Sequence, residues 1–279
     1  MKPAEVIDVH THGTGLFDTR AGAASDIHNM AKLYGIAGVT AFLPTIYPGK
    51  IDEMRRNMAA VLEAMEEQTP QEGVARILGV HLEGPFLNPR FAGALDKYSF
   101  LKPTHDNLSE VLTGFSAVIR VMTIAPELEG ALSLIERLVE LDIRVSMGHS
   151  GATYEQALEG KLAGASAVTH LFNAMRPFHH RGPGLAGFGL LDPDVYVEII
   201  PDGVHLAPET MEMVFRVKNP DRILLVSDSI KGPMYKDGVL QGGKLMLSRA
   251  AYALRSTNID PEIINRAGSD NPKAYLGLS

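Results

Sequence analysis

The sequence predicts an α/β fold, a (β/α)8 TIM barrel formed by residues 1–279 as a single domain. Eight short apolar runs alternate with stretches of helical periodicity. The runs carry Val, Ile and Leu on both faces, as strands of a parallel sheet covered by helices do. Eight such units in about 250 residues is the usual size of this barrel. A doubly wound open sheet is the alternative, but no G-x-G-x-x-G follows the first run, as a dinucleotide site in that fold would require.

The predicted strands are the apolar runs themselves. The first run leads into His10 and His12 and ends at Gly13, and the second is Val39–Thr45. The remaining runs have the same character, and each is separated from the next by a helical pattern or a Gly- and Pro-rich segment. We expect strands near 6–12, 39–45, 77–83, 117–124, 143–149, 167–172, 195–201 and 223–228.

The predicted helices lie between these strands and after the last one. The first begins at Ser25, a residue type that often caps a helix N-terminus. The second carries Met54, Met58, Val61 and Met65 at helical spacing. We expect helices near 25–34, 50–67, 128–140, 153–162, 208–217, 246–257 and 260–267.

Two connections are too long for plain strand-to-helix turns. Residues 84–107 and 173–190 are rich in Gly and Pro, and both follow strands that end in polar residues. In a barrel, loops of this kind build the active-site face, so we expect both to border the site.

The composition excludes several classes of function. The net charge is −7 and there is no basic run, which argues against a nucleic-acid or anionic-membrane partner. There is no cysteine, so a disulfide, a thiolate zinc site and a thiol nucleophile are excluded. We expect neither a leader nor a membrane span. We therefore expect a cytoplasmic protein that acts on a small molecule.

Polar residues end five of the predicted strands. His10 and His12 alternate in one strand and so project from the same face. Barrel strands converge at their C-terminal ends, and burying six ionisable groups there without a metal would be costly. Imidazole and carboxylate ligands suit zinc, iron, manganese or cobalt. The pattern predicts a metal site formed by His10, His12, Glu83, His149, His170 and Asp228.

One further histidine lies in the same region. His81 precedes Glu83 by two residues and shares its face, but lies deeper in the barrel. We expect His81 to be a core residue or a support for the ligands rather than a ligand.

In seven segments the chain resembles the amidohydrolase superfamily, and within it the deacetylases of amino-sugar phosphates. The matching segments occur in the family's order and span most of the chain. The E-G-P-F and T-H-L-F-N-A-M segments are specific to this branch, whereas an H-x-H strand is superfamily-level. The segments are Ile7–Gly13, His81–Phe86, Met147–Ser150, Thr169–Met175, Pro183–Gly187, Asp202–His205 and Val226–Asp228.

The resemblance implies roles for the metal-site residues. Glu83, His149 and His170 would be the main ligands of a divalent metal, most simply zinc. His10 and His12 would add a second metal, with Glu83 bridging the two. Asp228 would be the general acid/base that takes a proton from metal-bound water and returns it to the leaving amine, which agrees with the chemistry of such sites.

The resemblance also implies a substrate site. The segment after His170 would hold the phosphate of the sugar, through Asn173, Ala174, Arg181 and His205. An arginine next to glycines suits bidentate phosphate binding. The family implies a homodimer in which the partner's arginine reaches the phosphate.

Two features depart from the family pattern. The loop after Glu83 usually ends in Gly-Ala-His, whose histidine helps to polarise the substrate carbonyl, but here Leu95 follows Gly93 and Ala94. Leucine cannot donate a hydrogen bond, and His105 or His179 would have to substitute. The segments that build a small flanking β-sandwich in family members are not in this sequence.

Three functions follow from these expectations. The first is a metal-dependent amide hydrolase that deacetylates N-acetylglucosamine 6-phosphate or a related amino-sugar phosphate. The second keeps the metal site but acts on a different amide, a lactone or a cyclic amide. The third is a non-catalytic metal-binding barrel, which the presence of Asp228 and every expected ligand disfavours.

Overall fold

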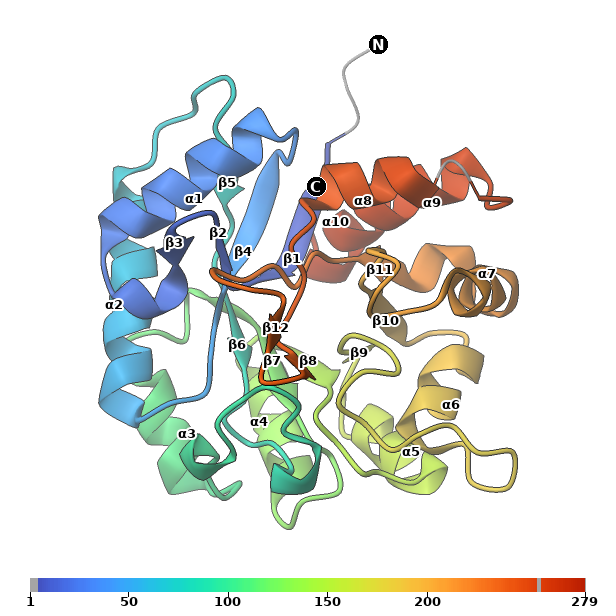
Figure 1. Ribbon diagram of the computed structural model, residues 1–279. Coiled ribbons are helices and arrows are strands. Elements are labelled where there is room, and N and C mark those ends of the chain that lie inside the picture. Colours follow the sequence, from blue (N-terminus) through green and yellow to red (C-terminus); the bar gives the residue numbers. More distant parts are fainter. Residues whose placement is uncertain (1–4, 255–256, 279) are drawn as a thin grey trace.

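The computed structural model describes residues 5–254 and 257–278, and its core is a parallel β-barrel (Figure 1). Its strands follow one another around the barrel in chain order, and a short outer strand, β5 (Arg76–Ile77), pairs with β4. The barrel strands are β1 (Ile7–Thr11), β4 (Ala41–Ile46), β6 (Val80–Glu83), β7 (Ile119–Ile124), β8 (Arg144–Met147), β9 (Ala167–Val168), β10 (Tyr196–Ile199) and β11 (Ile223–Leu225).

Backbone hydrogen bonds between the first strand and the segment after the last one close the barrel. Asp228 N–H donates to the His10 carbonyl and His12 N–H donates to the Ser229 carbonyl, both at 2.9 Å. Asp8 adds to this seam because its Oδ1 accepts the backbone N–H groups of His10 and Ser227, both at 3.2 Å. The seam places the ends of β1 and β11 next to each other.

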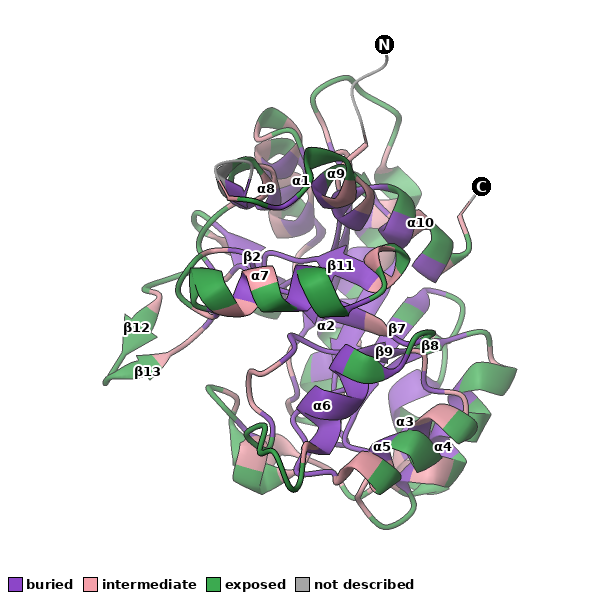
Figure 2. Cartoon of the chain, turned by 90° about the vertical axis from the view of Figure 1, so that its right-hand side faces the viewer, coloured by how far each residue is buried: buried purple, intermediate pink, exposed green. Residues whose placement is uncertain are grey.

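Helices surround the barrel and bury the outward faces of the strands. Figure 2 shows buried strands in the centre and helices whose exposed faces point outward. One apolar cluster, including Phe42, Met122 and Val197, lies between strands and helices, and a second, including Val9 and Tyr275, forms with residues from β4, β7 and β11. The helices are α1 (Ala24–Ile36), α2 (Ile51–Glu67), α3 (His105–Leu112), α4 (Ala131–Glu140), α5 (Tyr154–Leu162), α6 (Gly184–Leu191), α7 (Pro208–Val217), α8 (Leu247–Leu254), α9 (Pro261–Gly268) and α10 (Asp270–Leu276).

The predicted fold class is confirmed, with differences in individual elements. Helices α3 and α6 lie in or next to the predicted long connections, and α10 follows the last predicted helix. Ser25 is not the cap of α1: the N-cap is Ala23, and its side chain makes no capping hydrogen bond. The predicted helix 246–257 is α8, and residues 255 and 256 lie outside the described residues.

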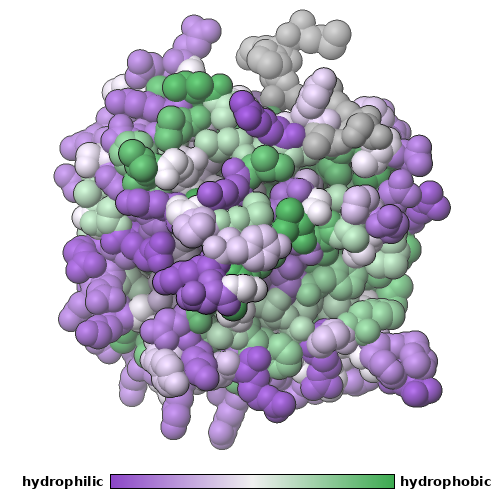
Figure 3. Space-filling model, in the orientation of Figure 1, coloured by the Kyte–Doolittle hydropathy of each residue, from purple (hydrophilic) through white to green (hydrophobic). Residues whose placement is uncertain are grey.

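The loops after the C-terminal ends of the strands form the face that Figure 1 shows. They include the short helices η2 (Pro89–Phe91) and η3 (Lys97–Ser99) and a hairpin of β12 (Tyr235–Lys236) and β13 (Val239–Leu240). The hairpin lies across the centre of this view and projects outward after a 90° turn (Figures 1 and 2). On the same face, hydrophilic residues gather along the left and lower edges (Figure 3). No helix in the described part of the chain is long and apolar enough to cross a membrane.

Short elements also precede and follow individual barrel strands. Directly after β1, strands β2 (Gly13–Thr14) and β3 (Phe17–Asp18) form a small antiparallel hairpin that leads into η1 (Thr19–Ala21). The short helix η4 (Pro220–Arg222) immediately precedes β11.

Candidate metal centre and catalytic pocket

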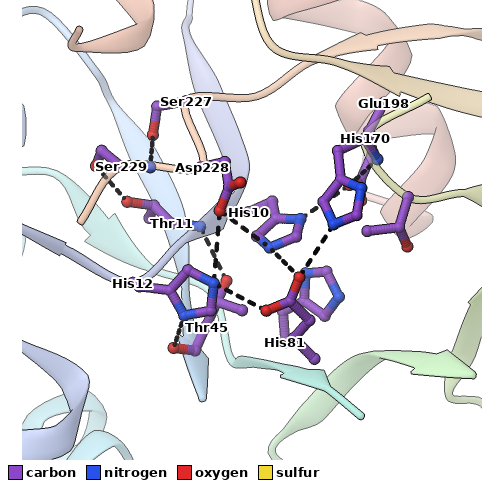
Figure 4. Close-up of polar contacts among 12 residues, drawn as sticks. His10, Thr11, His12, Thr45, His81, His170, Glu198, Ser227, Asp228 and Ser229 are labelled. Carbon is purple, nitrogen blue, oxygen red and sulfur yellow. Dashed lines mark hydrogen bonds and ion pairs between the residues drawn. The ribbon is translucent and has the colours of Figure 1, made fainter. Parts of the chain in front are cut away.

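The structure brings all six predicted metal-site residues together at the C-terminal end of the barrel. His149 Nε2 and His170 Nε2 lie 3.0 and 3.2 Å from Glu83 Oε1. His10 Nε2 is 3.5 Å from the same oxygen, and His12 Nε2 is 3.2 Å from the other oxygen, Oε2. Glu83 therefore lies among four histidines, and Figure 4 shows His10, His12 and His170 turned toward a common centre.

Each of the four histidines is held by a hydrogen bond at its other ring nitrogen. The Nδ1 atoms of His12, His149 and His170 lie 3.1, 2.9 and 3.2 Å from backbone carbonyl oxygens. His10 Nδ1 lies 2.9 Å from a carboxylate oxygen of Glu198. A carbonyl or a carboxylate can only accept, so each Nδ1 carries the proton and each Nε2 presents a lone pair to the centre. This is the tautomer that metal ligation at Nε2 requires.

The facing nitrogens fit a cation between them. His149 Nε2 and His170 Nε2 are 3.1 Å apart, although both carry lone pairs in this tautomer. His10 Nε2 is buried and has no hydrogen-bond partner among the described residues. The ligand atoms of Glu83, His149 and His170 lie within 4.8 Å of one another, as do those of His10, His12 and Glu83. The residues therefore fit one or two divalent metal ions, and Glu83 belongs to both groups of candidate ligands.

The electrostatics of the cluster keep its central carboxylate charged. Burial alone raises the pKa of Glu83, but when the rings carry a second proton, the charge of His149 and the hydrogen bonds from His10 and His12 outweigh it. The pKa of Glu83 consequently lies well below its usual range. Both oxygens of Glu83 therefore stay available as ligands at neutral pH.

Three of the site residues adopt backbone conformations that side chains seldom take. The φ angles are +47° at His149, +28° at His170 and +45° at Asp228. All three follow the ends of their strands, which are shorter than predicted because β8, β9 and β11 end at Met147, Val168 and Leu225. A non-glycine residue with positive φ costs free energy that the surrounding structure has to supply, and such residues cluster at functional sites.

Asp228 faces the histidine cluster from the seam of the barrel. Its Oδ1 lies 3.5 Å from His12 Nε2 and 3.6 Å from His10 Nε2, and its side chain is slightly exposed. Asp228 is thus close enough to exchange a proton with a small molecule at the centre, or to be a ligand itself.

His81 lies beneath the cluster, and that it is not a ligand stays a prediction, because the possible ligand atoms of His81, His10 and Glu198 also lie within 4.8 Å of one another. Its Nδ1 donates to the Val9 carbonyl at 3.0 Å, and its Nε2 lies 2.9 Å from Thr123 Oγ1. Both ring nitrogens therefore have partners within the barrel. Burial and the charge of His10 lower the pKa of His81 to about 3, so its ring stays neutral.

A pocket of about 270 Å³ opens above the cluster. It contains Asn173, Ala174 and His205 of the predicted substrate site. His205 is oriented by Asp202, whose Oδ2 lies 2.8 Å from His205 Nδ1. The other lining residues are His12, Tyr47, Glu83, Gly93, Ala94, Leu95, His149, His170, Asp228 and the hairpin residues Val239, Leu240, Gln241 and Gly242.

Some predicted residues do not join this pocket. Arg181 is exposed, and among the described residues its backbone N–H contacts His179 Nδ1 at 3.3 Å. His105 on α3 contacts Ser133 Oγ on α4 at 2.9 Å, and neither His105 nor His179 lines the pocket. Neither histidine therefore replaces the loop histidine of the family, and Leu95 itself lines the pocket.

The sequence analysis missed two residues that the structure places at the site. Glu198 is an interior residue of β10, and its only signal in the sequence is that it is a single acidic residue among apolar ones. Tyr47 follows β4 and stacks on the His12 ring, with centroids 3.8 Å apart. Burial and the nearby Asp18 raise the pKa of Tyr47 well above its usual value, so its hydroxyl keeps its proton.

Comparisons with known proteins agree with this geometry. Residues 6–279 match the model of the amidohydrolase family. The chain is 35% identical to N-acetylglucosamine-6-phosphate deacetylase of Bacillus subtilis over 257 residues, which cover 90% of this chain and 64% of that protein. It is 29% identical to N-acetylgalactosamine-6-phosphate deacetylase of Escherichia coli O157:H7, covering 93% of this chain and 70% of that one.

Solved structures show the same likeness. The chain superimposes on N-acetylglucosamine-6-phosphate deacetylase of Thermotoga maritima with a TM-score of 0.88 and 32% identity, covering 98% of this chain and 78% of that one. The match includes the barrel on which the histidine cluster, Glu83 and Asp228 are built. From the family match over nearly the whole chain and this cluster of buried histidines around one carboxylate, we conclude that the chain belongs to the amidohydrolase family.

Proposed function

We propose that the protein is a metal-dependent amide hydrolase that removes the acetyl group from N-acetylglucosamine 6-phosphate or a closely related amino-sugar phosphate. The observation that carries this proposal is the position of Asp228, which faces four Nε2-presenting histidines and Glu83 at the floor of a pocket. The likeness to deacetylases of two amino-sugar phosphates supports the substrate class.

Some residues of the site would bind the metal, and another would transfer the proton. The histidines would hold a divalent metal with Glu83, and that metal would polarise the amide carbonyl and acidify a water. Asp228 Oδ1 accepts a proton from the attacking water. It then donates this proton to the amide nitrogen, so that the C–N bond breaks and acetate and a free amine leave.

The other end of the pocket suits the sugar phosphate. Asn173 and Ala174 lie in the turn after His170, and His205 is held by Asp202. Burial alone raises the pKa of Asp202, but its hydrogen bonds with His205 outweigh this and lower it. A charged Asp202 fixes the orientation of the His205 ring at this end of the pocket, where the sugar phosphate would lie.

We also propose a homodimer in which the partner's Arg181 completes the phosphate site. Arg181 of this chain is exposed and outside its own pocket. Near His205, partly exposed Phe178 and Met213 line a second, apolar hollow. Light scattering would measure the assembly, and Arg181→Ala should raise KM for the phosphorylated substrate more than it lowers kcat.

The central test is acetate release by the purified protein loaded with zinc. N-acetylglucosamine 6-phosphate and its galactosamine epimer should be compared directly. Asp228→Asn should lower kcat by about 10²–10⁴-fold, the usual contribution of general acid–base catalysis, while zinc content stays unchanged. A variant as active as wild type would refute the role of Asp228, and zinc-loaded protein that releases no acetate would refute the substrate.

A second candidate is hydrolysis of a different amide, a lactone or a cyclic amide. The presence of Leu95 in the pocket favours it, because an apolar wall could accept a group other than acetyl. Turnover of non-phosphorylated amides that is unchanged by Arg181→Ala would select this candidate over the first.

A further inference from the structure

Tyr47 stands on the wall of the catalytic pocket. It follows β4 directly, and it lines both the catalytic pocket and an adjoining pocket of about 520 Å³. Ala94, Leu95 and Gln241 also line both pockets. Tyr47 would therefore border a substrate amide that binds above the histidine cluster.

The ring of Tyr47 is fixed in place. It is nearly parallel to the His12 ring, at an interplanar angle of 20° and a centroid distance of 3.8 Å. The Arg20 guanidinium lies 4.3 Å from the centroid of the Tyr47 ring and is itself held by Asp18, through contacts of 3.0 and 2.9 Å. These contacts orient the ring, and its hydroxyl is a buried polar atom without a hydrogen-bond partner among the described residues.

The neutral side-chain donors of the pocket are otherwise engaged. Asn173 Nδ2 donates to two backbone carbonyls at 3.3 Å, and Gln241 Nε2 donates to the Val239 carbonyl at 3.1 Å. His205 Nδ1 contacts Asp202, and the Nδ1 atoms of the clustered histidines have the partners described above. A buried hydroxyl without a partner costs free energy, so its presence in the pocket wall calls for a ligand atom that accepts from it.

We propose that the Tyr47 hydroxyl donates a hydrogen bond to the substrate carbonyl oxygen as negative charge develops on that oxygen. Leu95, next to Tyr47 in the pocket wall, offers no donor, so Tyr47 is the side chain that supplies one. The O–H bond of Tyr47 stays intact throughout, because the proton that moves in the reaction is the one that Asp228 handles. This proposal rests on the proposed hydrolytic function.

Tyr47→Phe tests the proposal by removing one oxygen while keeping the ring between His12 and Arg20. Loss of a donor to a developing oxyanion costs about 10²–10³-fold in kcat, and we expect a loss of about 10²-fold with KM changed less than threefold. Zinc content should match wild type, and the thermal unfolding midpoint should equal or exceed that of wild type, because the variant loses a buried hydroxyl without a partner. Tyr98→Phe is the matched control, because Tyr98 is 87% exposed, and it should leave all four quantities unchanged.

A binding measurement separates this proposal from the proposed function. A methylphosphonamidate of glucosamine 6-phosphate mimics the tetrahedral state, whereas glucosamine 6-phosphate has no carbonyl. Tyr47→Phe should weaken binding of the first by about 10²-fold and of the second by less than threefold. This comparison is informative even if wild type releases no acetate. Equal weakening of both ligands, unchanged kcat, or loss of zinc with the hydroxyl would each overturn the role of Tyr47.

Discussion

Glu198→Gln should weaken one metal site by acting through His10. Glu198 and His10 are both 0% exposed, and their hydrogen bond is 2.9 Å long. The other three clustered histidines have neutral backbone carbonyls as partners, so His10 alone is held by a charged group. A carboxylate partner makes an imidazole a stronger electron donor, which strengthens its bond to a metal.

The magnitude follows from this geometry. Glutamine keeps the shape of the side chain and an oxygen that can accept from His10 Nδ1 and from the His170 backbone N–H, which lies 3.2 Å from Glu198 Oε2. Only the negative charge is lost. Losing such a partner typically costs about 10–100-fold in metal affinity, which is about 1.4–2.8 kcal/mol. We expect this loss for one zinc ion of the pair, with the ion at Glu83, His149 and His170 affected less than threefold.

A competition assay between the protein and a chromophoric chelator for zinc measures the zinc affinity of both sites without any substrate. Mass spectrometry gives the zinc content per chain. In a His10→Asn background, Glu198→Gln should change zinc binding by less than twofold, because its route to the metal is gone. In a His12→Asn background the full factor should remain. An equal loss in the His10→Asn background would show that Glu198 acts elsewhere and would refute the reasoning.

Two further predictions concern the metal pair and the scaffold. Replacing His10 and His12 together by Asn should remove most of the hydrolytic activity and one zinc ion per chain, and near-normal turnover would show that a single ion at the other ligands suffices. Lys218→Met should destabilise the fold by about 1–3 kcal/mol in urea unfolding, because Lys218 Nζ donates to the Gly189 and Asp192 carbonyls at 2.7 and 2.5 Å and their loss leaves buried acceptors unpaired. Burial lowers the pKa of Lys218 to about 8 from its usual 10.5, so between these two pH values the unfolded chain binds more protons than the folded chain. The free energy of unfolding of wild type should therefore increase as pH rises from about 8 to 10.5. The Met variant should lack this increase.

The metal centre was largely predictable because it depends on strand ends. Residues at the C-terminal ends of parallel barrel strands meet regardless of their distance in the sequence, so Glu83, His149 and His170 could be grouped from sequence alone. The structure brings them within 4.8 Å of one another. The long connections were less predictable, since α6 is apolar on every side and lacks the periodicity that marks a surface helix.

Glu198 and Tyr47 were not predictable in the same way. A single acidic residue in an apolar strand and a tyrosine after a strand each have many ordinary explanations. Their roles depend on what lies across the barrel: Glu198 meets His10 over 188 positions of sequence separation, and Tyr47 stacks on a histidine from the neighbouring strand.

By itself the sequence determined the barrel, the family and the grouping of six candidate metal-site residues, because strand periodicity and the residues at strand ends are local properties of the chain. Only the tertiary structure decided which ring nitrogen each histidine presents to the centre. That choice depends on the acceptor that lies behind each ring, and three of the four acceptors are backbone carbonyls, whose positions no side-chain pattern encodes. The same is true of the pocket wall, where the tertiary structure places Leu95 beside the catalytic pocket and leaves the Tyr47 hydroxyl without a hydrogen-bond partner among the described residues.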